Sequence, residues 1–169
     1  KKAARQPDPP FTTSTLQQEA CRKLRFSAKQ TMAVAQKLYE GLSIGERGPT
    51  GLITYMRTDS VRISNEAAAW ARTYIETNFS REYLPAKPHF FSNKTQAQDA
   101  HEAIRPTLPE LTPEAVRPYL KKEEYDVYRL IWNRFIASQM SSALIEETEF
   151  DIRAEKYQFK AKGEVIKFP

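Results

Sequence analysis

Apolar residues recur every three to four positions over two stretches near the start of the chain, which predicts two short amphipathic helices. The first helix begins with Thr13 or Ser14 as N-cap and runs to about Arg25. The second begins after Ser27, which is a suitable N-cap, and stops at Gly41. Two short helices joined by a tight turn form a helix-turn-helix-like unit, although such pairs mostly serve packing.

Helical periodicity returns beyond the middle of the chain. Ser64 can cap a third helix that runs to about Phe79, and the Thr-Pro-Glu of residues 112–114 is a strong helix start. A longer helix over residues 122–140 carries a broad apolar face, which predicts a core helix. Residues 101–106 are expected to form a short helical turn that ends at a proline.

Alternating apolar and polar residues replace the helical period after Ser142. This alternation predicts a β-hairpin that turns near Glu155 and Lys156, followed by a last strand from Glu164 to Phe168. The polar, proline-ended segment before the first helix is typical of a linker or of the end of a strand. The whole pattern predicts a mainly α fold with minor β, of the α+β class.

The stretch Gly51–Ser60 (GLITYMRTDS) concentrates the candidate chemistry and is rich in residues that favour a short strand. Side chains two apart on a strand share a face, so Tyr55 and Arg57 would point together. A phenol with a pKa of about 10 is a poor nucleophile at neutral pH unless a charge or a base assists it. Arg57 could supply that charge and also neutralise a phosphate. The alternative is that Tyr55 is a core residue of an ordinary strand.

The charge distribution favours an anionic partner. The chain of 169 residues has a net charge of +5 and a pI of about 9.3. Residues 1–50 hold nine Lys and Arg against four Asp and Glu, so the positive excess lies ahead of the tyrosine stretch. A local excess of this kind favours a phosphate-binding face.

Cysteine usage and hydropathy limit the compartment. Cys21 is the single cysteine, which excludes an internal disulfide and fits a reducing compartment. The sequence has neither an apolar run of about 18 residues nor an apolar signal segment, so it predicts no membrane span and no secretory signal. We therefore expect a cytoplasmic protein of one domain, or of one domain plus part of another.

The tyrosine stretch resembles the active-site signature of type IA DNA topoisomerases of the bacterial topoisomerase I kind. Four further stretches are similar to the same family and occur in the same order: Pro9–Gln17 (PPFTTSTLQ), Ala35–Glu40 (AQKLYE), His101–Pro106 (HEAIRP) and Leu130–Met140 (LIWNRFIASQM). Together the five stretches span nearly the whole chain. The chain is identified as a central fragment of such an enzyme, carrying its active-site tyrosine domain.

The resemblance implies a division of the chain. Residues 13–141 would form the tyrosine domain, which is winged-helix-like in this family. Residues 1–12 would be a linker or the end of the arch domain, and residues 142–169 would be a partial arch-domain β segment. The remaining domains of the parent enzyme and single-stranded DNA would be the partners, and the location would be the cytoplasm, in association with the nucleoid.

The resemblance also implies the chemistry. Tyr55 would attack a phosphodiester of single-stranded DNA and form a 5′-phosphotyrosyl intermediate, which permits strand passage and relaxation of negative supercoils without ATP. Arg57 would stabilise the charge of the transition state, and His101 would approach the scissile phosphate. Glu40 matches a further catalytic position. The positions expected to bind DNA are Gln36, Thr58, Asp59, Arg105 and Gln17.

The family's Mg²⁺ is held by an acidic cluster in a separate Toprim domain, and no Asp-x-Asp-x-Glu pattern occurs in this sequence. We therefore expect no metal site in the fragment, and we expect the fragment alone to bind single-stranded DNA without cleaving it. Two alternatives stay open. One is a non-catalytic helix-turn-helix DNA-binding module. The other is a structural fragment that dimerises through exposed hairpin edges.

Overall fold

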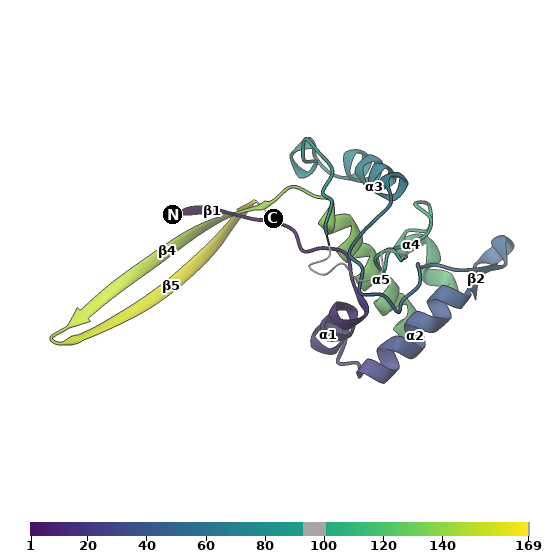
Figure 1. Ribbon diagram of the computed structural model, residues 1–169, viewed down its shortest axis with the longest axis horizontal. Coiled ribbons are helices and arrows are strands. Elements are labelled where there is room, and N and C mark those ends of the chain that lie inside the picture. Colours follow the sequence, from purple (N-terminus) through teal and green to yellow (C-terminus); the bar gives the residue numbers. More distant parts are fainter. Residues whose placement is uncertain (93–100, 169) are drawn as a thin grey trace.

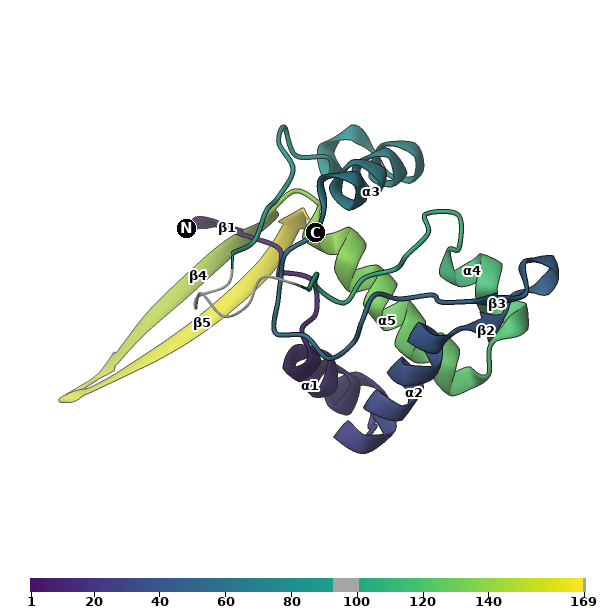
Figure 2. The same cartoon turned by 45° about the vertical axis from the view of Figure 1, so that its right-hand side comes forward.

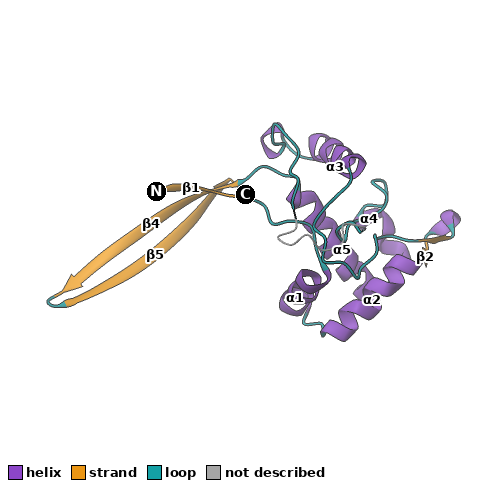
Figure 3. Cartoon of the chain, viewed as in Figure 1, coloured by secondary structure: helices purple, strands orange, loops and turns teal. Residues whose placement is uncertain are grey.

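The computed structural model describes residues 1–92 and 101–168 as a helical body from which a long β-ribbon projects (Figure 1). The described part contains five α-helices: α1 (Thr13–Leu24), α2 (Ala28–Glu40), α3 (Asn65–Asn78), α4 (Pro113–Val116) and α5 (Lys122–Ser138). It also contains five strands: β1 (Lys2–Arg5), β2 (Leu42–Ser43), β3 (Pro49–Thr50), β4 (Ala143–Ala154) and β5 (Tyr157–Phe168). Helices with small antiparallel sheets are the α+β composition that the sequence predicts (Figure 3).

Side-chain caps decide where the first two helices begin. Thr12 is the N-cap of α1 and forms a reciprocal capping box with Thr15, so the cap lies one residue before Thr13, the first of the two caps expected from sequence. The predicted Ser27 cap of α2 is confirmed, because its hydroxyl accepts a hydrogen bond from the Gln30 amide at 3.1 Å. The predicted stop is also confirmed: Gly41 ends α2 with a φ of +116°.

Helix α5 is the centre of the hydrophobic core, and the other helices pack around it (Figure 2). Its predicted apolar face is buried as expected: Tyr125, Tyr128, Ile131, Trp132, Phe135, Ile136 and Gln139. Trp70 of α3 packs its ring on Trp132 at 5.7 Å and on Phe135 at 4.9 Å between centroids. These ring contacts, with its partial burial against the core, make Trp70 a packing anchor. Within the described ranges, no helix combines the length and apolar character needed to cross a membrane.

The projecting ribbon is a three-stranded antiparallel sheet in the order β1-β4-β5. The predicted hairpin is confirmed, with a turn at residues 155–156, but β5 is one continuous strand, so the separate last strand expected from Glu164 is wrong. The register places Ile152 opposite Phe159 on one face and Asp151 opposite Lys160 on the other. The ribbon therefore has one apolar and one charged face, and Ile152 and Phe159 are both more than half exposed.

One buried hydroxyl of α5 gives a test of this core. Tyr128 is fully buried and donates a hydrogen bond to the Leu111 carbonyl oxygen at 2.6 Å. Burial, with a smaller contribution from the charge of Glu110, raises the pKa of Tyr128 well above its usual value, so the hydroxyl remains a donor.

Tyr128→Phe should lower the free energy of unfolding by about 1–3 kcal/mol, because it leaves a buried carbonyl without a donor. Urea denaturation measures the change. Tyr125→Phe is the matched control on the same helix, since the Tyr125 hydroxyl makes no hydrogen bond within the described part of the chain. The control should change stability by less than about 0.5 kcal/mol. Equal losses in the two variants would contradict the assignment.

Candidate active site

The stretch Gly51–Ser60 crosses the helical body as irregular coil with several bends, so the strand predicted there is wrong (Figure 3). Among the described residues, Ile53 is the one member of the stretch that makes a β-bridge, and its partner is Pro106. Ile53 and Met56 are both buried at 1% exposure, whereas Tyr55 is half-buried and Arg57 is exposed. In the part of the chain that the structure describes, no strand lies beside the segment over its length, so its backbone groups bond to several different partners and not to one ladder.

Thr54 ties the segment to the non-helical stretch that carries His101. Its hydroxyl donates to the Ala103 carbonyl oxygen at 2.7 Å and accepts from the Arg105 amide at 3.0 Å. The Thr54 amide donates to the Arg105 carbonyl oxygen at 2.9 Å. These bonds hold the residue before Tyr55 against the residues that follow His101.

Thr13, the first residue of α1, holds the segment on the C-terminal side of the tyrosine. Its hydroxyl donates to the carbonyl oxygen of Met56 at 2.8 Å and accepts from the Thr58 amide at 2.9 Å. The Thr13 amide in turn donates to the Thr58 carbonyl oxygen at 2.9 Å. A helix start is a natural anchor, because its first amides have no partner within the helix.

A third set of contacts fixes the entry to the segment. The Leu52 amide donates to the Leu38 carbonyl oxygen of α2 at 2.7 Å, and the Thr107 hydroxyl donates to the Gly51 carbonyl oxygen at 2.7 Å. A Cβ at Gly51 would lie only 2.7 Å from the Tyr39 carbonyl oxygen, so only glycine permits this close approach.

Residues 101–106 contain no helix and make isolated β-bridges at Ile104 and Pro106, so the helical turn predicted there is wrong. The Ile104 amide donates to the Phe11 carbonyl oxygen at 2.8 Å, and the Ala103 amide donates to the Arg62 carbonyl oxygen at 2.8 Å. These partners come from segments distant in sequence. The two hydrogen bonds prevent the stretch from coiling into a helix and place His101 beside Tyr55.

Three rings meet at the site. The centroid of the Tyr55 ring lies 5.4 Å from that of His101 and 5.3 Å from that of Tyr39, the latter in an edge-on arrangement at 66°. The structure therefore brings together two of the predicted residues, Tyr55 and His101. Tyr39 is not among the site residues that the sequence predicts, although it lies within the Ala35–Glu40 stretch. Its place next to Glu40, in a stretch similar to the family, was the available signal.

The charged residues after Tyr55 face solvent. Arg57 and Asp59 are exposed, and neither makes a hydrogen bond or ion pair with any residue that the structure describes. Thr58 is buried at 7% exposure, and its hydroxyl accepts from the Ser60 amide at 3.0 Å. Arg57 is thus available for an anionic ligand, whereas the Thr58 side chain acts inside the segment.

The other predicted site residues lie on neighbouring elements. On α2, the Gln36 amide side chain donates to the Glu40 carboxylate one helical turn away. Arg105 is mostly buried and donates through Nε to Glu102 at 2.9 Å, and it also donates to the Pro106 carbonyl oxygen. Gln17 is half-buried on α1. Within the described ranges, the ring contacts of Tyr55 are those with Tyr39 and His101.

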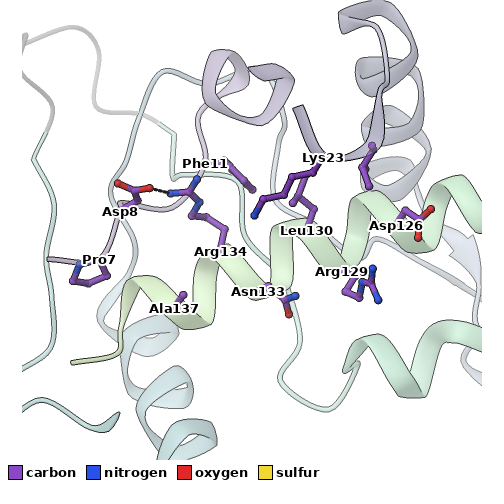
Figure 4. Close-up of a pocket in the computed structure, with 11 residues that line it drawn as sticks. Pro7, Asp8, Phe11, Lys23, Asp126, Arg129, Leu130, Asn133, Arg134 and Ala137 are labelled. Carbon is purple, nitrogen blue, oxygen red and sulfur yellow. Dashed lines mark hydrogen bonds and ion pairs between the residues drawn. The ribbon is translucent and has the colours of Figure 1, made fainter. Parts of the chain in front are cut away.

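A pocket of about 500 Å³ lies elsewhere, between α1 and α5, and contains none of the predicted site residues (Figure 4). Arg134 reaches across it to an ion pair with Asp8 at 2.5 Å. Behind it, Glu19 is buried, which opposes ionisation, but hydrogen bonds from Lys23 and Arg22 outweigh the burial and lower its pKa. These charges pair with one another and join α1, α5 and the N-terminal linker.

The residues present do not form a metal site. Within residues 1–92 and 101–168, no group of three or more His, Cys, Asp or Glu side chains is placed to hold an ion. Asp59 therefore does not form part of a metal site with any of the described residues.

The chain is similar to known proteins over nearly its whole length. A family model described as DNA topoisomerase matches residues 1–169. The chain is 50% identical to DNA topoisomerase 1 of Rickettsia prowazekii over 99% of its length and 49% identical to DNA topoisomerase 1 of Xylella fastidiosa over 98%. It is also similar to the full-length topoisomerase I structure from Thermotoga maritima, with a TM-score of 0.82 and 44% identity over 99% of this chain and 27% of that one.

The chain therefore belongs to the DNA topoisomerase family, in its bacterial type IA topoisomerase I group. It spans about a fifth of the length of the curated relatives that it matches, 22% of one and 21% of the other.

Thr54→Val should lower the free energy of unfolding by about 1–3 kcal/mol, since it leaves the Ala103 carbonyl and the Arg105 amide without their partner. It should also weaken the nuclear Overhauser contacts between the Tyr55 and His101 rings. Thr73→Val on α3 is the control, because its exposed hydroxyl only bonds back to its own helix. Unchanged ring contacts in Thr54→Val would show that other bonds position the tyrosine.

Proposed function

We propose that this chain supplies the tyrosine-bearing part of a bacterial type IA DNA topoisomerase. The Tyr55 hydroxyl loses its proton as its oxygen bonds to the phosphorus of a phosphodiester in single-stranded DNA, the bond from phosphorus to the 3′ oxygen breaks, and the 3′ oxygen takes up a proton, so no net proton is gained or lost. The 5′-phosphotyrosyl ester retains the energy of the broken bond, so a second strand can pass and the break can be resealed without ATP. Through these steps the parent enzyme relaxes negative supercoils.

The observation that carries the proposal is the placement of Tyr55. Its ring is half-buried between Tyr39 and His101, while its segment is held from both sides by hydrogen bonds of Thr54 and Thr13. A nucleophile held in this way loses little further freedom on reaction. Membership of the family supports the same role.

The neighbouring residues have distinct roles in this proposal. The unpaired guanidinium of Arg57 neutralises charge that develops on the phosphate, and preorganised donors of this kind contribute strongly to catalysis. The His101 imidazole donates a hydrogen bond or a proton to the same group. Glu40 completes the catalytic set. The residues proposed to hold the DNA strand are Gln36, Asp59, Arg105 and Gln17. Thr58, which was expected to bind DNA, is buried and bonds to the Ser60 amide, so we propose that it supports the DNA-binding segment from inside.

The rest of the parent enzyme completes the site. We assign residues 13–141 to the tyrosine domain, residues 1–12 to a linker or the end of the arch domain, and residues 142–169 to part of the arch domain. The α1–α2 pair followed by the β2–β3 ribbon supports a winged-helix-like description. Mg²⁺ would be held by a Toprim domain of the parent, and the enzyme would work on DNA in the cytoplasm.

The isolated chain should bind labelled single-stranded DNA weakly and form no covalent adduct with Mg²⁺ present. The logarithm of its association constant should fall linearly with the logarithm of the salt concentration, at a slope of about −0.7 per phosphate contact, because binding releases counterions. Filter binding across salt concentrations and denaturing gels measure the two properties. A robust covalent adduct would refute the inactivity of the chain, and dimers in light scattering without DNA would favour the structural alternative.

In the full-length parent, Tyr55→Phe should abolish the covalent adduct and relaxation of supercoils, because the attacking oxygen is lost while the ring contacts remain. DNA binding should stay within about twofold, a change of less than about 0.5 kcal/mol. Tyr119→Phe is the control, since Tyr119 is half exposed and makes no ring contact with Tyr55. Supercoil relaxation by Tyr55→Phe would overturn the proposed function and leave the non-catalytic DNA-binding module.

A further inference from the structure

Tyr39 is an aromatic residue in contact with Tyr55 that has no role in the function proposed above. It lies in the last turn of α2, and its side chain is 40% exposed. Its ring meets the Tyr55 ring edge-on, at 5.3 Å between centroids. Edge-on aromatic pairs are attractive beyond the area that they bury, so this contact favours one orientation of the Tyr55 ring.

The backbones below the two rings are joined as well. The carbonyl oxygen of Leu38, the residue before Tyr39, accepts a hydrogen bond from the Leu52 amide at 2.7 Å. The Tyr39 carbonyl oxygen lies only 2.7 Å from the position that a Cβ at Gly51 would take, so the two backbone segments are in close contact. The separation of the rings is therefore set by fixed backbone and not by flexible side chains alone.

The two ring partners of Tyr55 contact it independently. Tyr39 comes from a helix and His101 from a non-helical stretch, and no ring contact joins the two. Each therefore restricts the tyrosine from a different part of the site. The tyrosine side chain rotates about two bonds, χ1 and χ2. An in-line phosphoryl transfer requires its hydroxyl oxygen to lie opposite the leaving oxygen, which only one orientation of the side chain achieves.

We propose that Tyr39 is a positioning residue that aims the Tyr55 ring at the scissile phosphate through its own ring, without contact to the reacting atoms. The inference rests on the proposed function, and it adds a residue to the machinery of the same site. Because the ring carries the effect, the Tyr39 hydroxyl is dispensable, and the residue governs the rate of cleavage more than the affinity for DNA.

The first experiment uses the full-length parent with Mg²⁺ and a labelled single-stranded oligonucleotide. Tyr39→Ala should slow single-turnover cleavage at saturating DNA about two- to tenfold, the range expected for one edge-on ring contact. The dissociation constant should change less than about twofold. Tyr39→Phe should cleave at the parental rate. Tyr119→Ala, which removes an exposed tyrosine outside the ring cluster, should also leave the rate unchanged.

The second experiment uses the isolated chain and needs no catalysis. Nuclear magnetic resonance of ring-labelled tyrosine should show contacts between the Tyr39 and Tyr55 rings. In Tyr39→Phe the Tyr55 signals should stay close to those of the parent. In Tyr39→Ala they should shift and report faster ring motion, while the melting temperature shows that the fold is kept.

The outcomes separate the two proposals. Absence of any adduct in the unmodified parent would overturn the proposed function while the ring contacts could still be measured. Parental cleavage by Tyr39→Ala would overturn the positioning role. An equal loss in Tyr39→Phe and Tyr39→Ala would overturn it as well, because it would assign the effect to the hydroxyl. A loss of DNA affinity that accounts for the slower cleavage would instead make Tyr39 a DNA contact.

Discussion

The segment that carries Tyr55 has no regular secondary structure, so its position depends on hydrogen bonds to segments far away in the chain. Thr54 bonds to the stretch after His101, and Thr13 bonds to the residues after Tyr55. Buried backbone groups must find partners, and a coil segment finds them one at a time. Each of these bonds therefore holds a particular part of the site in place.

The same anchoring explains how residues 41–51 can project from the body next to the site. The bond between the Leu52 amide and the Leu38 carbonyl closes the base of residues 41–51, which include the small β2–β3 ribbon. At its far end the ribbon is held by an ion pair between Arg47 and Glu110 at 3.1 Å. The residues before and after the ribbon are joined by this hydrogen bond between Leu38 and Leu52, so the ribbon can project without moving Tyr55.

The site is open on the side of its charged residues. Arg57 and Asp59 are exposed without partners among the described residues, and the pocket between α1 and α5 lies apart from them. An open site with an unpaired cation suits an extended anionic ligand such as a nucleic acid strand. It fits the proposal that other domains of the parent cover the tyrosine and supply the metal.

Most of the helical body follows from local signals in the sequence. Caps such as Ser27 and Ser64, the stop at Gly41 and the apolar face of the long helix are local signals, and they predicted α2, α3 and α5 closely. The hairpin also followed from alternation of apolar and polar residues. The resemblance named Tyr55 and His101 as site residues, and the structure places their rings in contact.

The conformation of the two stretches that meet at the site depends on contacts between distant parts of the chain. Residues 51–60 contain strand-forming residues, yet a strand needs a neighbouring strand, and among the described residues only Ile53 of this stretch makes a bridge. Residues 101–106 form no helix because their amides bond to Phe11 and Arg62, partners that no local pattern reveals. The contact of Tyr39 with Tyr55 has the same origin. Hydrogen bonds and ring contacts between distant segments are set by packing, so neither periodicity nor spacing could predict them.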